Sequence, residues 1–237
     1  PLSLGIETVG GAVAKLIMRN SAVPARAVER FSTSVDGQVN VLIHVVQGER
    51  ELVGDCRSLA RFHLRGIPPM PAGVPQIEVE FMVDANGILD VTAVERRSGR
   101  RAAIQVVPSY GLTREEVDRM ERESIEHARA DMRAHHVIDL VVNATLDLKW
   151  IGEALDRVRD ELEPAYVAEL ERNMAHVRSL IDSARRDPAA ADADALAKAK
   201  QDLDVASVRA HEVAIANSLR GMGTAASSAK GDGRPAS

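Results

Sequence analysis

The sequence predicts a β + α protein in two parts: an antiparallel β-sandwich over residues 1–112 and an α-helical region over 113–220. Two observations support this division. Glycine and proline are dense as far as position 111 and then become sparse up to 221, as expected where turns give way to helices. Apolar residues recur at every second position in the first part and at every third or fourth position in the second. Residues 221–237, rich in glycine, serine and alanine, are predicted to be disordered.

Alternation predicts three strands in the first part. Apolar residues alternate with mostly polar ones over 39–45, 77–83 and 89–93, which is the pattern of a strand with one buried face. The second strand is the clearest, because Glu78 and Glu80 separate its apolar residues.

Turn residues punctuate these strands. The Asn-Gly pair at 86–87 has the residue types that accept a positive φ in a tight hairpin. Asp-Gly at 36–37 and Ser-Gly at 98–99 are predicted to mark the turns of two more strand pairs. The proline-rich segment 66–75 is predicted to be a loop. Short strands separated by such turns favour an antiparallel sandwich.

Helical signals begin at Thr113, which can cap a first turn, and Glu116 completes a capping box with it. Apolar residues then follow at helical spacing, with Pro164 suited to a first helical turn and Pro188 at a break. A last helix is predicted over about 194–219. Three consecutive helices with short connections predict an antiparallel bundle.

Composition restricts the class of protein. A chain of 237 residues with 45% apolar residues can bury a core. Its single cysteine, Cys56, excludes an intramolecular disulfide and cannot alone hold an iron-sulfur cluster or a structural zinc. The net charge of −5 argues against a nucleic-acid partner. No apolar run is long enough to cross a membrane and no signal segment opens the chain, so a cytoplasmic location is expected.

The sequence gives little support for a catalytic or metal-binding role of any residue. His135 and His136 are neighbours on a predicted helix, where they point about 100° apart and do not readily share one metal. His44 is predicted to be a surface or half-buried residue, and Cys56 an incidental thiol with no histidine nearby in sequence. The charged residues 49–51 fit a turn cluster as well as acid-base chemistry. We therefore expect no catalytic residues and no metal site in this chain.

Several segments carry a family resemblance. The chain reads PLSLGIET at 1–8, PQIEV at 75–79 and DANGIL at 84–89, and residues 41–62 join an alternating strand to a charged turn and a second strand. In these segments, in register and without gaps, the chain resembles the peptide-binding domain of DnaK-type heat-shock chaperones.

Further segments resemble one branch of that family. The strings GERELV at 48–53, DCRSLARF at 55–62, LRGIP at 64–68 and PSYGLT at 108–113 look like HscA, the branch devoted to iron-sulfur cluster assembly. The resemblance is close over residues 1 to about 115 and looser over the helices that follow.

The resemblance implies that the sandwich holds an extended client peptide in a channel and that the helical region forms a lid and a bundle. Periodicity alone would instead place Val41, Ile43 and Ile77 in an ordinary core. The peptide-binding positions that the resemblance implies are Ile6, Thr8, Val9, Phe31, Ser32, Ser34, Val41, Ile43 and Ile77.

This sequence departs from the family pattern at several places. Ser34 stands where a bulky apolar residue helps to close an arch over the peptide, so the arch is expected to be weaker. Ala12 replaces a larger apolar residue, which predicts a wider pocket. Ala72 and Thr145 stand at the positions of an Arg-Asp pair that latches the lid. We therefore expect a lid that is held by apolar contact and opens readily.

The resemblance also implies partners and cofactors. HscA-like chaperones recognise a Leu-Pro-Pro-Val-Lys segment of the IscU-like iron-sulfur scaffold protein and work with an HscB-like J-type co-chaperone. The chain begins at Pro1 without a methionine and is expected to be a fragment, with an ATPase domain that binds ATP and Mg²⁺ preceding it. No cofactor, nucleic acid or membrane is expected for the fragment itself.

Three alternatives stay open from the sequence. A general DnaK-like chaperone would bind many unfolded chains rather than one scaffold protein. A structural module would bind its partner through the helical bundle rather than the sandwich. A hydrolase is the remote third alternative.

Overall fold

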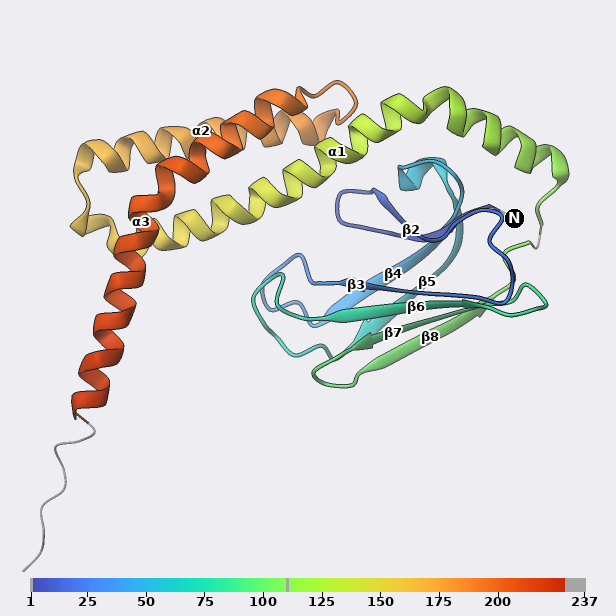
Figure 1. The fold of residues 1–237 in the computed structure, drawn as a ribbon, viewed down its shortest axis with the longest axis horizontal. Coiled ribbons are helices and arrows are strands. Elements are labelled where there is room, and N and C mark those ends of the chain that lie inside the picture. Colours follow the sequence, from blue (N-terminus) through green and yellow to red (C-terminus); the bar gives the residue numbers. More distant parts are fainter. Residues whose placement is uncertain (1, 110, 229–237) are drawn as a thin grey trace, which may run out of the picture. The chain divides into compact units, whose positions relative to one another are not determined.

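Two four-stranded antiparallel sheets form the first part of the chain (Figure 1). The computed structural model describes residues 2–109 and 111–228. One sheet has the order β2-β1-β4-β5 and contains β1 (Leu4–Glu7), β2 (Val13–Ile17), β4 (Asn40–Gln47) and β5 (Arg57–Arg65). The other has the order β3-β6-β7-β8 and contains β3 (Ala25–Phe31), β6 (Ile77–Val83), β7 (Leu89–Glu95) and β8 (Arg101–Val106). The predicted antiparallel sandwich is confirmed.

The core of the sandwich follows from the alternation in β6 and β7. Ile77, Val79 and Phe81 on β6 are fully buried, and so are Leu89 and Val91 on β7. Each of these residues points to the same face of its strand because side chains alternate along a strand. Residues of both sheets join this apolar cluster, which therefore lies between the sheets.

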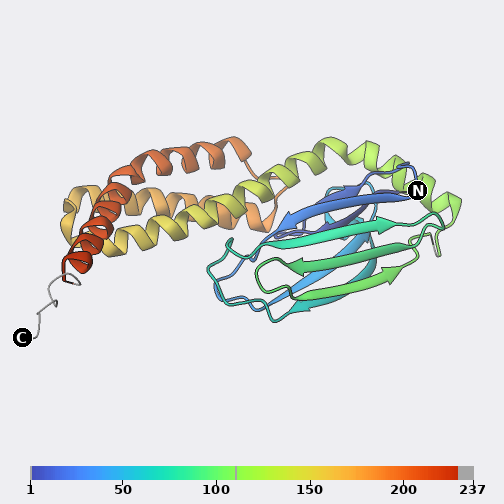
Figure 2. The same cartoon turned by 60° about the horizontal axis from the view of Figure 1, so that its bottom comes forward.

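Two of the three predicted hairpin turns are confirmed. Gly87 has a φ of 79° between β6 and β7, where the Asp84 amide donates to the Ile88 carbonyl at 2.9 Å. Gly99 has a φ of 69° between β7 and β8. Figure 2 shows these three strands side by side.

The turn at 36–37 does not join a strand pair, so that prediction is wrong. Gly37 has the expected positive φ, 67°, but β3 and β4 belong to different sheets. β3 pairs with β6, and β4 pairs with β1 and β5. An Asp-Gly pair signals a local reversal and carries no information on which strands form hydrogen bonds.

Three long helices follow, as predicted: α1 (Arg114–Val158), α2 (Pro164–Arg186) and α3 (Ala193–Ser228). The capping box is confirmed, since the Thr113 amide donates to Glu116 Oε2 at 2.8 Å and the Glu116 amide donates to Thr113 Oγ1 at 3.2 Å. α3 continues past its predicted end at about 219, so residues 221–228, which were predicted to be disordered, are helical. The rest of the predicted tail, 229–237, lies outside the described residues.

The chain divides into two compact units, one ending at His135 and the other beginning at His136. The division falls inside α1, so the first turns of α1 belong to the unit that contains the sandwich. In the second unit, the later part of α1 packs with α2 and α3 around a common apolar core that includes the fully buried Leu170 and Leu203. Across the described residues, no helix is long and apolar enough to cross a membrane.

Candidate functional site

Strand β4 has an open edge beside the end of β1. The pairing of β1 with β4 runs only from Leu4 opposite Gln47 to Ile6 opposite Val45. The pairing of β4 with β5 continues to Asn40 opposite Arg65. In the strand ladders of the described residues, positions 40–43 of β4 are therefore paired on one side only. Unpaired N–H and C=O groups of this kind can receive an extended peptide as an added strand.

The apolar residues predicted for the channel belong to one apolar cluster or pack against it. Ile6, Ile43 and Ile77 are buried, with 3%, 3% and 0% of their surface exposed, and belong to the sandwich core. Phe31 and Val41 are partly buried and pack against the same cluster. The core position that periodicity predicts thus holds for Ile43 and Ile77, whereas Val41, like Phe31, keeps surface that a ligand could cover.

The other predicted residues lie in loops at the ends of β1 and β3. The Thr8 hydroxyl donates to the carbonyl of Ala12 at 3.2 Å, and the Ser32 hydroxyl donates to the carbonyl of Pro75, in the segment before β6, at 2.6 Å. Val9 follows Thr8 and is 50% exposed. Ser34 is also exposed. Their contact with a peptide stays a prediction.

A group of charged residues that the sequence argument did not assign to a site connects the sandwich to α1. Arg50 makes two hydrogen bonds to the carboxylate of Asp131, from Nε to Oδ2 at 2.5 Å and from Nη2 to Oδ1 at 3.0 Å. Glu51 accepts from Lys15 Nζ at 2.5 Å through Oε1, and its Oε2 lies 2.7 Å from His135 Nδ1. We call Lys15, Arg50, Glu51, Asp131 and His135 the ion-pair cluster.

The ion-pair cluster is a contact that the sequence did not predict. It holds the part of α1 before His136 to the sandwich through charged groups. The expectation that the lid is held by apolar contact, because Ala72 and Thr145 cannot form the family's ion pair, concerns a later part of α1 and stays a prediction. A further pair joins Arg19 to Glu121 at 3.5 Å.

The charges in this cluster lower the pKa of two carboxyl groups. Burial alone would raise the pKa of Glu51, but the hydrogen bonds from Lys15 and His135 bring it below its usual value. Burial also opposes ionisation of Asp131, and the Arg50 guanidinium overcomes it and lowers the pKa of that carboxyl. Both carboxylates are therefore ionised at neutral pH.

His44 differs from the prediction of a surface or half-buried residue, because only 4% of its surface is exposed. Its Nδ1 lies 2.6 Å from Glu7 Oε2 and its Nε2 lies 2.8 Å from Ser58 Oγ. A buried imidazole is tolerated here because both ring nitrogens have a hydrogen-bond partner. The described residues contain no group of three or more His, Cys, Asp or Glu side chains that could hold a metal ion.

Cys56 is expected to react slowly with alkylating reagents, because burial raises the pKa of its thiol to about 11. The thiolate is the reactive form, so at pH 8 its rate should be about a hundredfold below that of an ordinary cysteine. The rate of iodoacetamide labelling as a function of pH measures this, with the unfolded chain in denaturant as the reference. A titration midpoint near pH 8.5 in the folded protein would contradict the burial.

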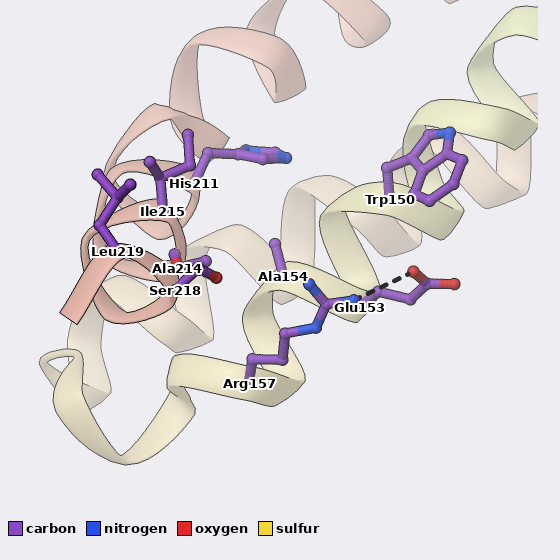
Figure 3. A pocket seen from close by; sticks show the side chains of 9 residues that line it. All are labelled: Trp150, Glu153, Ala154, Arg157, His211, Ala214, Ile215, Ser218 and Leu219. Carbon is purple, nitrogen blue, oxygen red and sulfur yellow. Dashed lines mark hydrogen bonds and ion pairs between the residues drawn. The ribbon is translucent and has the colours of Figure 1, made fainter. Parts of the chain in front are cut away.

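The second unit carries a shallow groove of about 290 Å³ between α1 and α3. Figure 3 shows its lining side chains, among them Trp150 on α1 and Ile215 on α3. These two side chains are 42% and 60% exposed. This apolar surface keeps open the alternative that the bundle binds a partner.

Comparisons with known proteins support one family. The model of the Hsp70 protein family matches residues 1–209. A chaperone protein HscA homolog of Shewanella loihica is 45% identical over 220 residues, which cover 93% of this chain and 34% of that protein. The chaperone protein HscA of Photorhabdus laumondii is 49% identical over 183 residues, which cover 77% of this chain and 29% of that protein. This chain thus spans about a third of their length, and it belongs to the Hsp70 family of DnaK-type chaperones, in its HscA branch.

Proposed function

We propose that this chain binds an extended client peptide along the open edge of β4, and that the client is the Leu-Pro-Pro-Val-Lys segment of an IscU-like iron-sulfur scaffold protein. The observation that carries the proposal is the one-sided pairing of β4 at positions 40–43, together with the partly buried Val41 on this edge and Phe31, which packs against the same apolar cluster. Backbone groups of the edge would bind the peptide backbone, and the apolar surface would accept a side chain. The names of the HscA relatives support a chaperone, and the choice of client comes from the resemblance to the HscA branch.

Magnitudes indicate the affinity to expect. A buried leucine contributes roughly 1.5–3 kcal/mol, each backbone hydrogen bond adds about 0.5–1.5 kcal/mol, and association costs at least ~4 kcal/mol. Micromolar binding follows. The two prolines of the client hold it in an extended conformation and lower the cost of ordering it, although they remove two hydrogen-bond donors.

Fluorescence anisotropy of a labelled Leu-Pro-Pro-Val-Lys peptide tests the proposal. Micromolar binding is expected, with weaker binding of a scrambled peptide and of a generic leucine-rich peptide. Val41→Ala should weaken binding, whereas the control Val28→Ala, on a residue of β3 that is 42% exposed, should not. Equal binding of the leucine-rich peptide would favour the general DnaK-like chaperone.

We further propose that the chain does not hydrolyse ATP by itself. In the whole protein, peptide binding would be coupled to a domain that binds ATP and Mg²⁺, and to an HscB-like J-type co-chaperone. Turnover of ATP by purified residues 1–237 would overturn this part of the proposal.

A further inference from the structure

A chain of side chains centred on the buried His44 joins three strands of the first sheet where the open edge begins. His44 on β4 contacts Glu7 on β1 through Nδ1 and Ser58 on β5 through Nε2, at 2.6 and 2.8 Å. We call Glu7, His44 and Ser58 the histidine relay. In the neutral imidazole, Nδ1–H donates to the Glu7 carboxylate and Nε2 accepts from the Ser58 hydroxyl, so every member is satisfied.

The histidine relay lies where the backbone pairing of β1 with β4 ends. The β1 ladder with β4 ends at Ile6 opposite Val45. Glu7 is the next residue of β1, and the same register places it opposite His44, so the contact between their side chains continues the pairing by one position beyond the backbone ladder. On the other side, the pairing of β4 with β5 shifts register between Val45 and Val46, which brings Ser58 opposite Val46. The relay therefore lies at the point where the ladder of β1 with β4 ends.

The imidazole of the relay lies on the face of the sheet opposite to the core. Ile43 and Val45 point into the core, with 3% and 0% of their surface exposed, so His44 between them points to the other face. It cannot touch a peptide that lies over the apolar cluster. Glu7, however, directly precedes Thr8 and Val9, the loop residues at the end of β1.

We propose that the histidine relay is a positioning device, which holds the end of β1 at the distance from β4 that an extended peptide needs. This inference rests on the proposed function, because it assigns a role at that same site. Glu7, His44 and Ser58 are positioning residues. They bind no ligand, and they act through the backbone of residues 7–9.

The test compares Glu7→Ala with Glu7→Gln. Alanine removes the acceptor of the His44 Nδ1–H bond, and glutamine keeps an acceptor oxygen of the same reach. Glu7→Ala should weaken binding of the Leu-Pro-Pro-Val-Lys peptide on the order of tenfold, through faster dissociation, and Glu7→Gln should bind within about twofold of the wild type. Backbone amide NMR shifts of Thr8 and Val9, measured without peptide, should move in Glu7→Ala and stay in place in Glu7→Gln.

A destabilised control separates positioning from stability. Asp84 Oδ1 accepts from the amides of Asn86 and Ile88 in the turn at the far end of β6 from Ile77. Asp84→Ala should lower the melting temperature and leave peptide binding unchanged. If Glu7→Gln weakened peptide binding as much as Glu7→Ala does, the positioning role of the relay would be overturned. The same holds if Asp84→Ala weakened peptide binding as much as Glu7→Ala does. A wild-type protein that binds no peptide would overturn the proposed function as well, and unchanged binding in Glu7→Ala would overturn the relay alone.

Discussion

Arg50→Ala is expected to lower the free energy of unfolding by about 2–4 kcal/mol and to speed peptide dissociation at least about tenfold. The two hydrogen bonds from Arg50 neutralise the carboxylate of Asp131, a residue with 4% of its surface exposed. Removing the guanidinium leaves that charge buried without its partner, which costs more than the pair itself contributes. Because the pair joins a sandwich loop to the first turns of α1, its loss should also loosen this part of the helix.

Denaturant unfolding and stopped-flow dissociation of labelled peptide measure these two effects. The matched control is Arg26→Ala, because Arg26 pairs with Glu80 at 2.8 Å but is 65% exposed, and such pairs contribute only about 0–1 kcal/mol. The double variant Arg50→Met with Asp131→Leu should recover most of the lost stability, since no buried charge remains. An effect of Arg50→Ala no larger than that of Arg26→Ala would contradict the role of the ion-pair cluster.

The same pair gives a pH dependence with a defined sign. The pKa of Asp131 is lower in the folded protein than in the unfolded chain, so its ionised form stabilises the fold above the unfolded value of about 4. That contribution is lost as pH falls through the lower folded value. The stability difference between the wild type and Asp131→Asn should therefore be full at pH 7 and shrink below about pH 4.

Ile77→Ala is expected to cost about 2–4 kcal/mol of unfolding free energy. Ile77 has none of its surface exposed and lies between Phe31 on β3 and Glu95 on β7 in the second sheet. Truncation removes buried methyl groups and leaves a cavity that the two flanking strands cannot close. Denaturant unfolding of the variant, with Val28→Ala as the exposed control, measures the loss. A cost below about 1 kcal/mol would place Ile77 in an open channel rather than in the core.

Local pattern was sufficient for the elements with strong periodicity. β6 and β7 alternate buried and partly exposed residues almost without interruption, and the capping box at Thr113 marks the start of α1 within one residue. β3 was not predicted, because its partly buried positions include the small residues Ala25 and Ala27 and it lies at a sheet edge. The sequence did not predict which strands pair with each other, because strand pairing is a tertiary property that turn residues do not encode.

The candidate site was only partly predictable. The resemblance supplied its residues, but the open edge of β4 depends on where the pairing with β1 ends, which no local pattern records. Arg50 and Asp131 are 81 positions apart in sequence. One signal was available: Asp131 and His135 are one helical turn apart, and so share a face, while residues 49–51 form an acid-base-acid turn. A helix face and a turn that both carry acidic and basic side chains suggest that the two segments contact each other.

Amide hydrogen exchange with and without saturating Leu-Pro-Pro-Val-Lys peptide tests the central claim most directly, because it locates the peptide on the chain. The proposed function predicts new protection at residues 41–43 of β4 and in the loops at 8–9 and 32–34. The second unit, including the groove beside Trp150, should exchange as before. Protection confined to residues 205–219 of α3, with β4 unchanged, would contradict the account and assign binding to the helical bundle.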